Sequence, residues 1–299
     1  MPLLECVPNV SEGRRPEVVA RLADRLRVLP GARLLDHSAD ADHNRAVFTL
    51  AGEPEPLHQA LLGLYVEALA TIDLRRQRGV HPRVGAVDVV PFVPLAGASM
   101  ADAVDAAHTL GAEVARRFDL PVYYYEEAAL DPARRRLPDL RRGGFEGYAA
   151  RMAEPGWRPD AGPARLHPTA GVTLIGARFF LIAFNLLLRS SEVETARRIA
   201  RRLRESSGGL PAVRAIGVLL ASRGQAQVSL NLLDYRRTSM TQAFARAREE
   251  ARREGIEIAS SEVVGLVPAA AVPARPEELL LDLRPELVLE NRLREAGLA

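Results

Sequence analysis

The order of helix-type and strand-type patterns constrains the fold of this chain more than any other feature. Runs of β-branched residues predict strands, and apolar residues every three or four positions predict amphipathic helices. In both halves of the chain the patterns follow the order β-α-β-β-α-β, and the first half adds one more helix and strand. This is the order of a ferredoxin-like split β-α-β unit. Two such units side by side would leave a cleft between their sheets, a common place for a ligand.

The boundaries follow from where each pattern starts and stops. In the first half we expect strands at residues 3–10, 32–36, 45–50, 84–92 and 121–125, and helices at 16–29, 54–72 and 100–118. In the second half we expect a strand at 171–176, an apolar segment at 179–188, strands at 213–220, 226–233 and 256–266, helices at 191–207 and 238–255, and a helical tail from 276.

Glycine and proline pairs break every period between about 132 and 168, which predicts a long irregular connection. The predicted fold is therefore α/β (α+β), with two ferredoxin-like subdomains packed side by side and a substrate cleft or channel between them. The expected domains are residues 1–166, including the connecting segment 132–166, and residues 167–299.

Composition excludes several classes of chemistry. The chain has 299 residues, and all 40 of its Lys+Arg residues are arginine. The absence of lysine excludes pyridoxal-phosphate Schiff bases, lysine-dependent aldolases and the Walker A motif. The single cysteine, Cys6, rules out internal disulfides and argues against iron–sulfur clusters.

The same counts bear on location and partners. No apolar run reaches the roughly 18 residues of a membrane span, and the N-terminus has no basic region typical of a signal peptide. We therefore expect a cytoplasmic protein without a membrane partner. The formal net charge is only +2, with both signs interleaved and no basic block, so nucleic acid is not an expected partner.

Residues 78–92 combine a glycine-marked turn with a buried strand. His81 lies between two arginines, and Pro82 favours an extended backbone at the histidine. An imidazole held at the lip of a strand is a plausible proton-transfer group at neutral pH. A single histidine in a turn is also commonly a solvated or capping residue, and these residues alone leave both interpretations open.

Two other stretches carry unusual polar residues. The hairpin tip at 36–44 is rich in Asp and His, but it fails the EF-hand template, and the chain has no HExxH motif, so no metal site is expected. In the second half, Gln227 and Asn231 alternate with apolar residues, and Asn185 stands in an apolar run. Both are compatible either with a ligand cavity or with ordinary structure, an exposed strand face for the first and a satisfied core amide for the second.

Several of these stretches resemble one known family. The similarity is carried by residues 5–13 (ECVPNVSEG), 44–45 (NR), 81–88 (HPRVGAVD), 176–185 (GARFFLIAFN) and 228–234 (VSLNLLD), and it runs in order from residue 3 to at least Pro268. Together they are similar to the glutamate formimidoyltransferase (formiminotransferase) family, whose fold is two α/β subdomains with a folate channel between them. Some members carry an additional cyclodeaminase domain, for which this chain ends too early.

The resemblance implies an enzyme of histidine breakdown and one-carbon metabolism. It would move a formimidoyl group between N-formimidoyl-L-glutamate and tetrahydrofolate, which serves as co-substrate, and His81 falls on the catalytic histidine. Arginine forks suit the carboxylates of glutamate and folate. The candidate substrate-binding and folate-binding residues are Asn9, Asp40, Asn44, Arg45, Arg83, Arg178, Asn185, Gln227 and Asn231. The family also suggests a homodimer.

One position departs from the family pattern. Members fused to the cyclodeaminase carry an acidic residue two places after the aspartate that matches Asp36, whereas this chain has Ser38. Either a neighbouring aspartate, Asp40 or Asp42, assists His81 instead, or the substrate or the rate differs. Glycine as the amino-acid partner, 5-formyl-tetrahydrofolate as substrate, and folate binding without catalysis all remain open.

Overall fold

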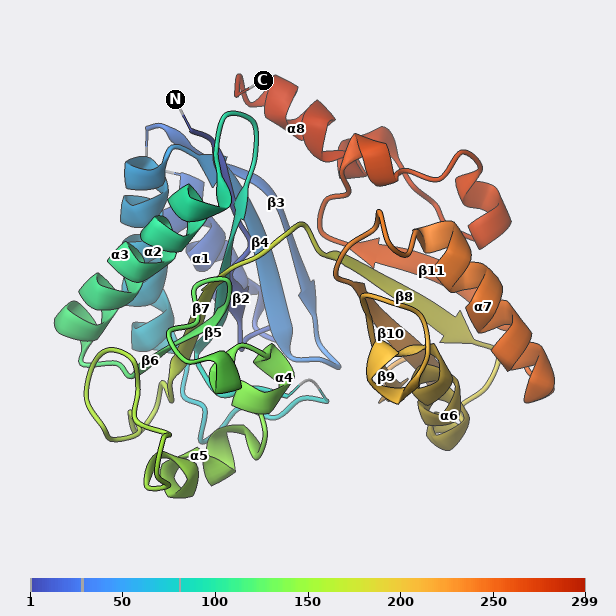
Figure 1. The fold of residues 1–299 in the computed structure, drawn as a ribbon, viewed down its shortest axis with the longest axis horizontal. Helices are drawn as coiled ribbons and strands as arrows, with labels where there is room; N and C mark the ends of the chain where they lie inside the picture. The colour runs from blue at the N-terminus through green and yellow to red at the C-terminus, as the bar shows by residue number, and fades with distance from the viewer. Residues whose placement is uncertain (1, 28–29, 81, 299) are drawn as a thin grey trace. The chain divides into compact units, whose positions relative to one another are not determined.

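The chain forms two compact units, each with its own sheet. The computed structural model describes residues 2–27, 30–80 and 82–298. The units are Met1–Arg178 and Phe179–Ala299. One contains a seven-stranded sheet and the other a four-stranded sheet, with helices packed on each (Figure 1). The expected α/β class with two units is confirmed.

The first unit extends a ferredoxin-like sheet. Its elements are β1 Leu4–Cys6, β2 Asn9–Val10, α1 Pro16–Arg27, β3 Ala32–Asp40, β4 Arg45–Gly52, α2 Pro54–Thr71, β5 Val87–Pro94, α3 Met100–Phe118, β6 Val122–Glu126, η1 Pro132–Arg134, α4 Leu137–Leu140, α5 Gly144–Met152 and β7 Thr173–Ala177. The strands lie in the order β3, β4, β1 with β2, β5, β7 and β6. The first part, through β5, is antiparallel, and β7 and β6 continue it in parallel.

Helices cover both faces of this sheet. Helices α1, α2 and α3 bury their apolar stripes in one core cluster with residues such as Phe48, Val90 and Phe92. Helix α3 begins at a capping box formed by Ser99 and Asp102, so its start matches the sequence pattern. A second cluster joins Leu140 before α5 and Tyr148 within it to Val89, Leu174 and two tyrosines of β6, Tyr123 and Tyr125.

Strand β7 corrects the expected domain boundary. The sequence placed a strand at 171–176 in the second half and divided the chain at 166/167, but β7 pairs in parallel with both β5 and β6 of the first sheet. The first unit therefore continues to Arg178. The irregular connection is the crossover that returns the chain to a parallel strand, which always requires a long connection.

The second unit is a four-stranded ferredoxin-like unit. It comprises β8 Ile182–Leu188, α6 Val193–Leu203, η2 Glu205–Ser207, β9 Val213–Leu220, β10 Gln225–Leu232, α7 Met240–Arg253, β11 Ile258–Val264, η3 Ala269–Ala271, η4 Pro276–Leu279, η5 Pro285–Leu287 and α8 Leu289–Glu295. The order β11-β8-β10-β9 is fully antiparallel. None of the described helices is long and apolar enough to cross a membrane.

A buried carboxylate joins the two long helices of the second unit. Glu250 on α7 has no solvent exposure. Its Oε1 forms ion pairs with Arg253 (2.8 Å) and Arg246 (2.9 Å), and its Oε2 forms one with Arg202 on α6 (3.2 Å). Because the carboxylate is inaccessible to water, these guanidinium groups replace water as the partners that stabilise its charge.

We expect Glu250→Gln to lower the free energy of unfolding by about 2 kcal/mol, because it removes a buried charge whose arginine partners remain half-exposed. Urea titration of the full chain measures this. Glu249→Gln is the matched control: Glu249 also pairs with Arg246, at 3.5 Å, but is solvent-exposed, so it should cost less than about 0.5 kcal/mol. Equal losses in the two variants would contradict a role for burial.

Candidate functional site

A pocket in the first unit collects several of the predicted site residues. It is lined by Ser11, His43, Asn44, Arg45, Gln77, Arg83 and Asp88. Asn44, Arg45 and Arg83 were candidates from the sequence, and they come from segments far apart in the chain. The pocket lies where the turn between β3 and β4 meets the segment that leads into β5.

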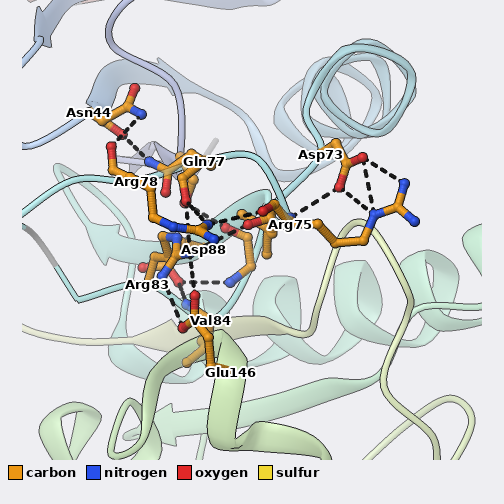
Figure 2. Close-up of polar contacts among 12 residues, drawn as sticks. Asn44, Asp73, Arg75, Gln77, Arg78, Arg83, Val84, Asp88 and Glu146 are labelled. Atoms are coloured by element: carbon orange, nitrogen blue, oxygen red, sulfur yellow. Dashed lines mark hydrogen bonds and ion pairs between the residues drawn. The ribbon is translucent and has the colours of Figure 1, made fainter.

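Asn44 fastens these two segments together. Its backbone is left-handed, with a φ of 49°, which asparagine tolerates better than most residues. The side-chain Oδ1 accepts a hydrogen bond from the N–H of Gly13 (3.0 Å), and Nδ2 donates to the carbonyl of Arg78 (2.8 Å). Gln77 Nε2 donates back to the Asn44 carbonyl (2.8 Å; Figure 2). Asn44 therefore stabilises its own turn and also holds residues 77 and 78 in place at the pocket.

The same contact continues through Gly79 and Val80. A Cβ at Gly79 would lie 2.3 Å from the carbonyl oxygen of His43, so only glycine allows this approach. The N–H of Val80 donates to the carbonyl of Asp42 (3.1 Å). The next residue, His81, lies outside the described residues. The chain that reaches it is thus fixed to the β3–β4 turn.

Asp88 fixes the chain on the other side of position 81. Its Oδ1 accepts hydrogen bonds from the N–H groups of Val84 (2.7 Å) and Gly85 (3.0 Å). Its Oδ2 pairs with the guanidinium of Arg141, just after α4. A Cβ at Gly85 would lie 2.0 Å from the carbonyl of Val172, because the backbones cross there in close contact.

Arg83 is engaged by protein groups. Its guanidinium donates to Glu146 Oε1 (2.8 Å) and Oε2 (3.2 Å), and to the carbonyl of Gln77 (2.9 Å; Figure 2). The hydrogen bond from Arg83 lowers the pKa of Glu146. Arg83 was predicted to hold a substrate carboxylate, and in this structure Glu146 occupies that fork.

Arg45 supplies a cation to the pocket. Burial and, to a smaller extent, the charge of nearby Arg141 lower the pKa of Arg45 to about 10, with Asp88 and Asp40 opposing the shift. Asp40 also accepts a hydrogen bond from the N–H of His43 (2.7 Å), which closes the turn. A cation in a confined pocket beside fixed backbone is suited to an anionic ligand.

Asn9 and Arg178, like Asp40, are predicted residues of the first unit that lie outside this lining. Asn9, in β2, donates to the carbonyl of Val7 (3.0 Å). Arg178 ends the unit, where its N–H donates to the carbonyl of Phe92 (3.0 Å). Its positive charge opposes the rise that burial causes in the pKa of Cys6 and of Tyr125.

The remaining candidates share one sheet face of the second unit. Strand pairing sets Asn185 opposite Ser229, and Gln227 and Asn231 two residues to either side on the same face. The other face is apolar and packs against α6, with α7 beside it (Figure 1). Asn185 Oδ1 and Gln227 Oε1 are buried and have no hydrogen-bond partner among the described residues.

The site residues that the sequence analysis did not identify mostly form hydrogen bonds with backbone groups. Ser11 donates to the carbonyl of Gly85 (2.7 Å), and Gln77 and Arg141 act as described above. Gln77 carried a weak signal, because glutamine occurs at only five positions, while Arg141 carried none. Within the described residues no group of three or more His, Cys, Asp or Glu side chains could hold a metal ion.

Comparison with known proteins covers nearly the whole chain. Residues 3–178 match the formiminotransferase domain, N-terminal subdomain, and residues 183–277 match the formiminotransferase domain. A glutamate formimidoyltransferase from Streptococcus pyogenes serotype M1 is 40% identical over 90% of each chain. One from Thermoplasma acidophilum is 39% identical over 91% of this chain and 90% of its own. The formimidoyltransferase-cyclodeaminase of Rattus norvegicus is 41% identical over 90% of this chain and 51% of its own. The chain therefore belongs to the formiminotransferase family.

Proposed function

We propose that this chain transfers a formimidoyl group between N-formimidoyl-L-glutamate and tetrahydrofolate. The observation that carries the proposal is the match to both formiminotransferase subdomain models, from residue 3 to residue 277. The relatives that match over nine tenths of both chains have the name glutamate formimidoyltransferase. Tetrahydrofolate is a co-substrate in this reaction, and glutamate is the amino-acid product.

The reaction requires one proton to be moved between two nitrogens. An amine nitrogen of tetrahydrofolate forms a bond to the amidine carbon, and that nitrogen loses a proton. The bond from the same carbon to the glutamate nitrogen then breaks, and the departing nitrogen takes up a proton. A histidine with a pKa near about 6.5 can accept the first proton and donate the second. We assign this role to His81.

The carboxylates of the substrates require cations. Arg45, which lines the pocket, is the proposed partner of the glutamate part, and Asn44 and Asp40 shape its surroundings. Arg83, now held by Glu146, and Arg178 are further proposed forks. Asn9 is the remaining proposed contact from the first unit.

The polar face of the second unit is proposed to meet the pterin edge. Gln227 and Asn185 keep buried amide oxygens without a partner among the described residues. An unsatisfied buried acceptor costs about 1–3 kcal/mol, so such groups are retained where a ligand supplies the donor. The amino and ring N–H groups of a pterin are donors of this kind, and Asn231 extends the same row.

We further infer a cytoplasmic homodimer. Strand β9 forms an edge of the second sheet, and it exposes Ile216 and Leu219. Apolar edge strands of this length pair with another chain unless they are protected. A second copy of this chain is the proposed partner.

His81→Ala should lower kcat by about 10²–10⁴-fold, because it removes the proposed acid and base. The assay combines tetrahydrofolate and formimidoylglutamate, and follows 5,10-methenyl-tetrahydrofolate by absorbance after acid cyclisation. His58→Asn on α2 is the control and should retain kcat. Full activity in His81→Ala would disprove the assignment, and no activity in the unmodified protein would disprove the proposed reaction.

The affinity for formimidoylglutamate should weaken as the pH rises through about 10, where Arg45 loses its charge. The substrate carboxylates remain ionised there, so only the cation side of the pair changes. Arg45→Gln should raise KM roughly 10-fold to 100-fold at pH 8. The variant's KM should then approach that of the unmodified protein above pH 10. Equal KM values at pH 8 would exclude Arg45 as the carboxylate partner.

Gln227→Leu should separate folate binding from stability. The change removes a buried oxygen that has no partner among the described residues, so the free energy of unfolding should stay the same or rise. The KM for tetrahydrofolate should increase about 10-fold. Ser229→Ala, on the same face but partly exposed, is the control with a smaller expected effect. A loss of stability with unchanged KM would assign Gln227 to the core.

A further inference from the structure

Asp88 and Arg141 form a buried ion pair for which the proposed reaction has no direct use. Only 3% of the Asp88 side chain and 13% of the Arg141 side chain are exposed. Asp88 is the second residue of β5, and Arg141 follows α4, 53 residues later. A buried carboxylate is tolerated only with hydrogen bonds and an opposite charge, and here Arg141 supplies the charge.

The hydrogen bonds of Asp88 go to the backbone that follows position 81. The two N–H groups that donate to Asp88 belong to residues 84 and 85, which form the turn before β5. Figure 2 shows Asp88 beside Arg83 and Val84. The carboxylate therefore fixes the backbone only a few residues after His81.

The segment that carries Arg141 contacts the same turn twice more. The N–H of Phe145 donates to the carbonyl of Arg83 (2.9 Å), and Glu146 holds the Arg83 guanidinium. Residues 141–146 are thus attached to residues 83–88 through one buried and one exposed ion pair and one backbone hydrogen bond. Upstream of position 81, the β3–β4 turn makes the corresponding contacts.

We propose that Asp88 and Arg141 are positioning residues for His81. They act through the backbone of residues 82–85 and contact no reacting atom. The inference rests on the proposed function, in which His81 moves the proton. Loss of Arg141 leaves the Asp88 carboxylate with its two backbone N–H donors but without its ion-pair partner. The turn then rearranges to solvate or protonate the carboxylate, and the histidine loses its alignment with the substrate.

The chain contains a matched ion pair elsewhere in the same unit. Asp160 accepts a hydrogen bond from the N–H of Tyr124 (2.8 Å) and pairs with Arg134 at 2.6 Å. The exposed fractions of its side chains, 3% for Asp160 and 12% for Arg134, match those of the first pair. It fixes the edge of β6 and not the turn after position 81, so its loss reports the general cost of breaking such a pair.

Arg141→Met should lower kcat roughly 10-fold to 100-fold, because small misplacements of a reacting group have effects of this size. KM for both substrates should stay within about threefold, since the pocket's cation at Arg45 remains. Arg134→Met should retain kcat within about threefold, although it loses a comparable ion pair. The same assay and the full chain serve for all variants.

A double variant provides the rescue. Asp88→Asn keeps an oxygen for the two N–H groups but removes the charge, so Asp88→Asn combined with Arg141→Met should recover most of the kcat lost by Arg141→Met. Hydrogen exchange adds a readout independent of turnover. Amides at 84–86 should exchange faster in Arg141→Met and regain protection in the double variant, whereas Arg134→Met should affect only 122–126.

Three outcomes overturn the inference. Arg141→Met retains kcat, or Arg134→Met lowers it equally, or the double variant is no better than Arg141→Met. Failure of the proposed function gives a different result, because the unmodified protein itself then fails to turn over formimidoylglutamate. Activity in the unmodified protein, loss in His81→Ala and full activity in Arg141→Met overturn the positioning role alone.

Discussion

The solvation of one buried carboxylate organises the first unit around its pocket. Asp88 cannot keep its charge at the base of β5 without donors, and it finds them in the turn at 84–85 and in Arg141. These contacts bring the irregular segment after β6 against the turn that follows His81. The neighbouring turn between β3 and β4 is fixed by the amides of Asn44 and Gln77. Both sides of position 81 are therefore held by polar side chains that have found partners within the protein.

The polar groups of the second unit are arranged in the opposite way. Asn185 and Gln227 are buried but keep oxygens that no described residue satisfies. A protein does not gain stability from such atoms. Under the proposed function the two units have different roles: the first holds the proposed reacting group in place, and the second offers unused hydrogen-bonding capacity to a ligand.

Local pattern predicted most of the fold. The period of apolar residues predicted the helices, including both ends of α3, and the runs of apolar and β-branched residues predicted the hairpin strands. Pattern could not predict the partner of β7, because a buried parallel strand has the same apolar sequence in either sheet. The candidate site was predicted in part, through the motif at 81–88 and the pair Asn44 and Arg45. The role of Arg141 could not be predicted, because an ion pair between residues far apart in the chain produces no spacing pattern. Arginine is also common here, with 40 in the chain, so one of them does not stand out.

The place of β7 also has a consequence for biosynthesis. It lies between β5 and β6, although both precede it in the chain. When β6 leaves the ribosome, the strand that will join it to the sheet is still about fifty residues from emerging. Domains generally fold as units during synthesis, N-terminal part first. Strands β1 to β5 can pair at that stage, whereas β6 and its three tyrosines stay without a sheet partner until residue 177 is made. The nascent chain therefore carries an unpaired apolar strand, which is a site for aggregation, throughout translation of the crossover.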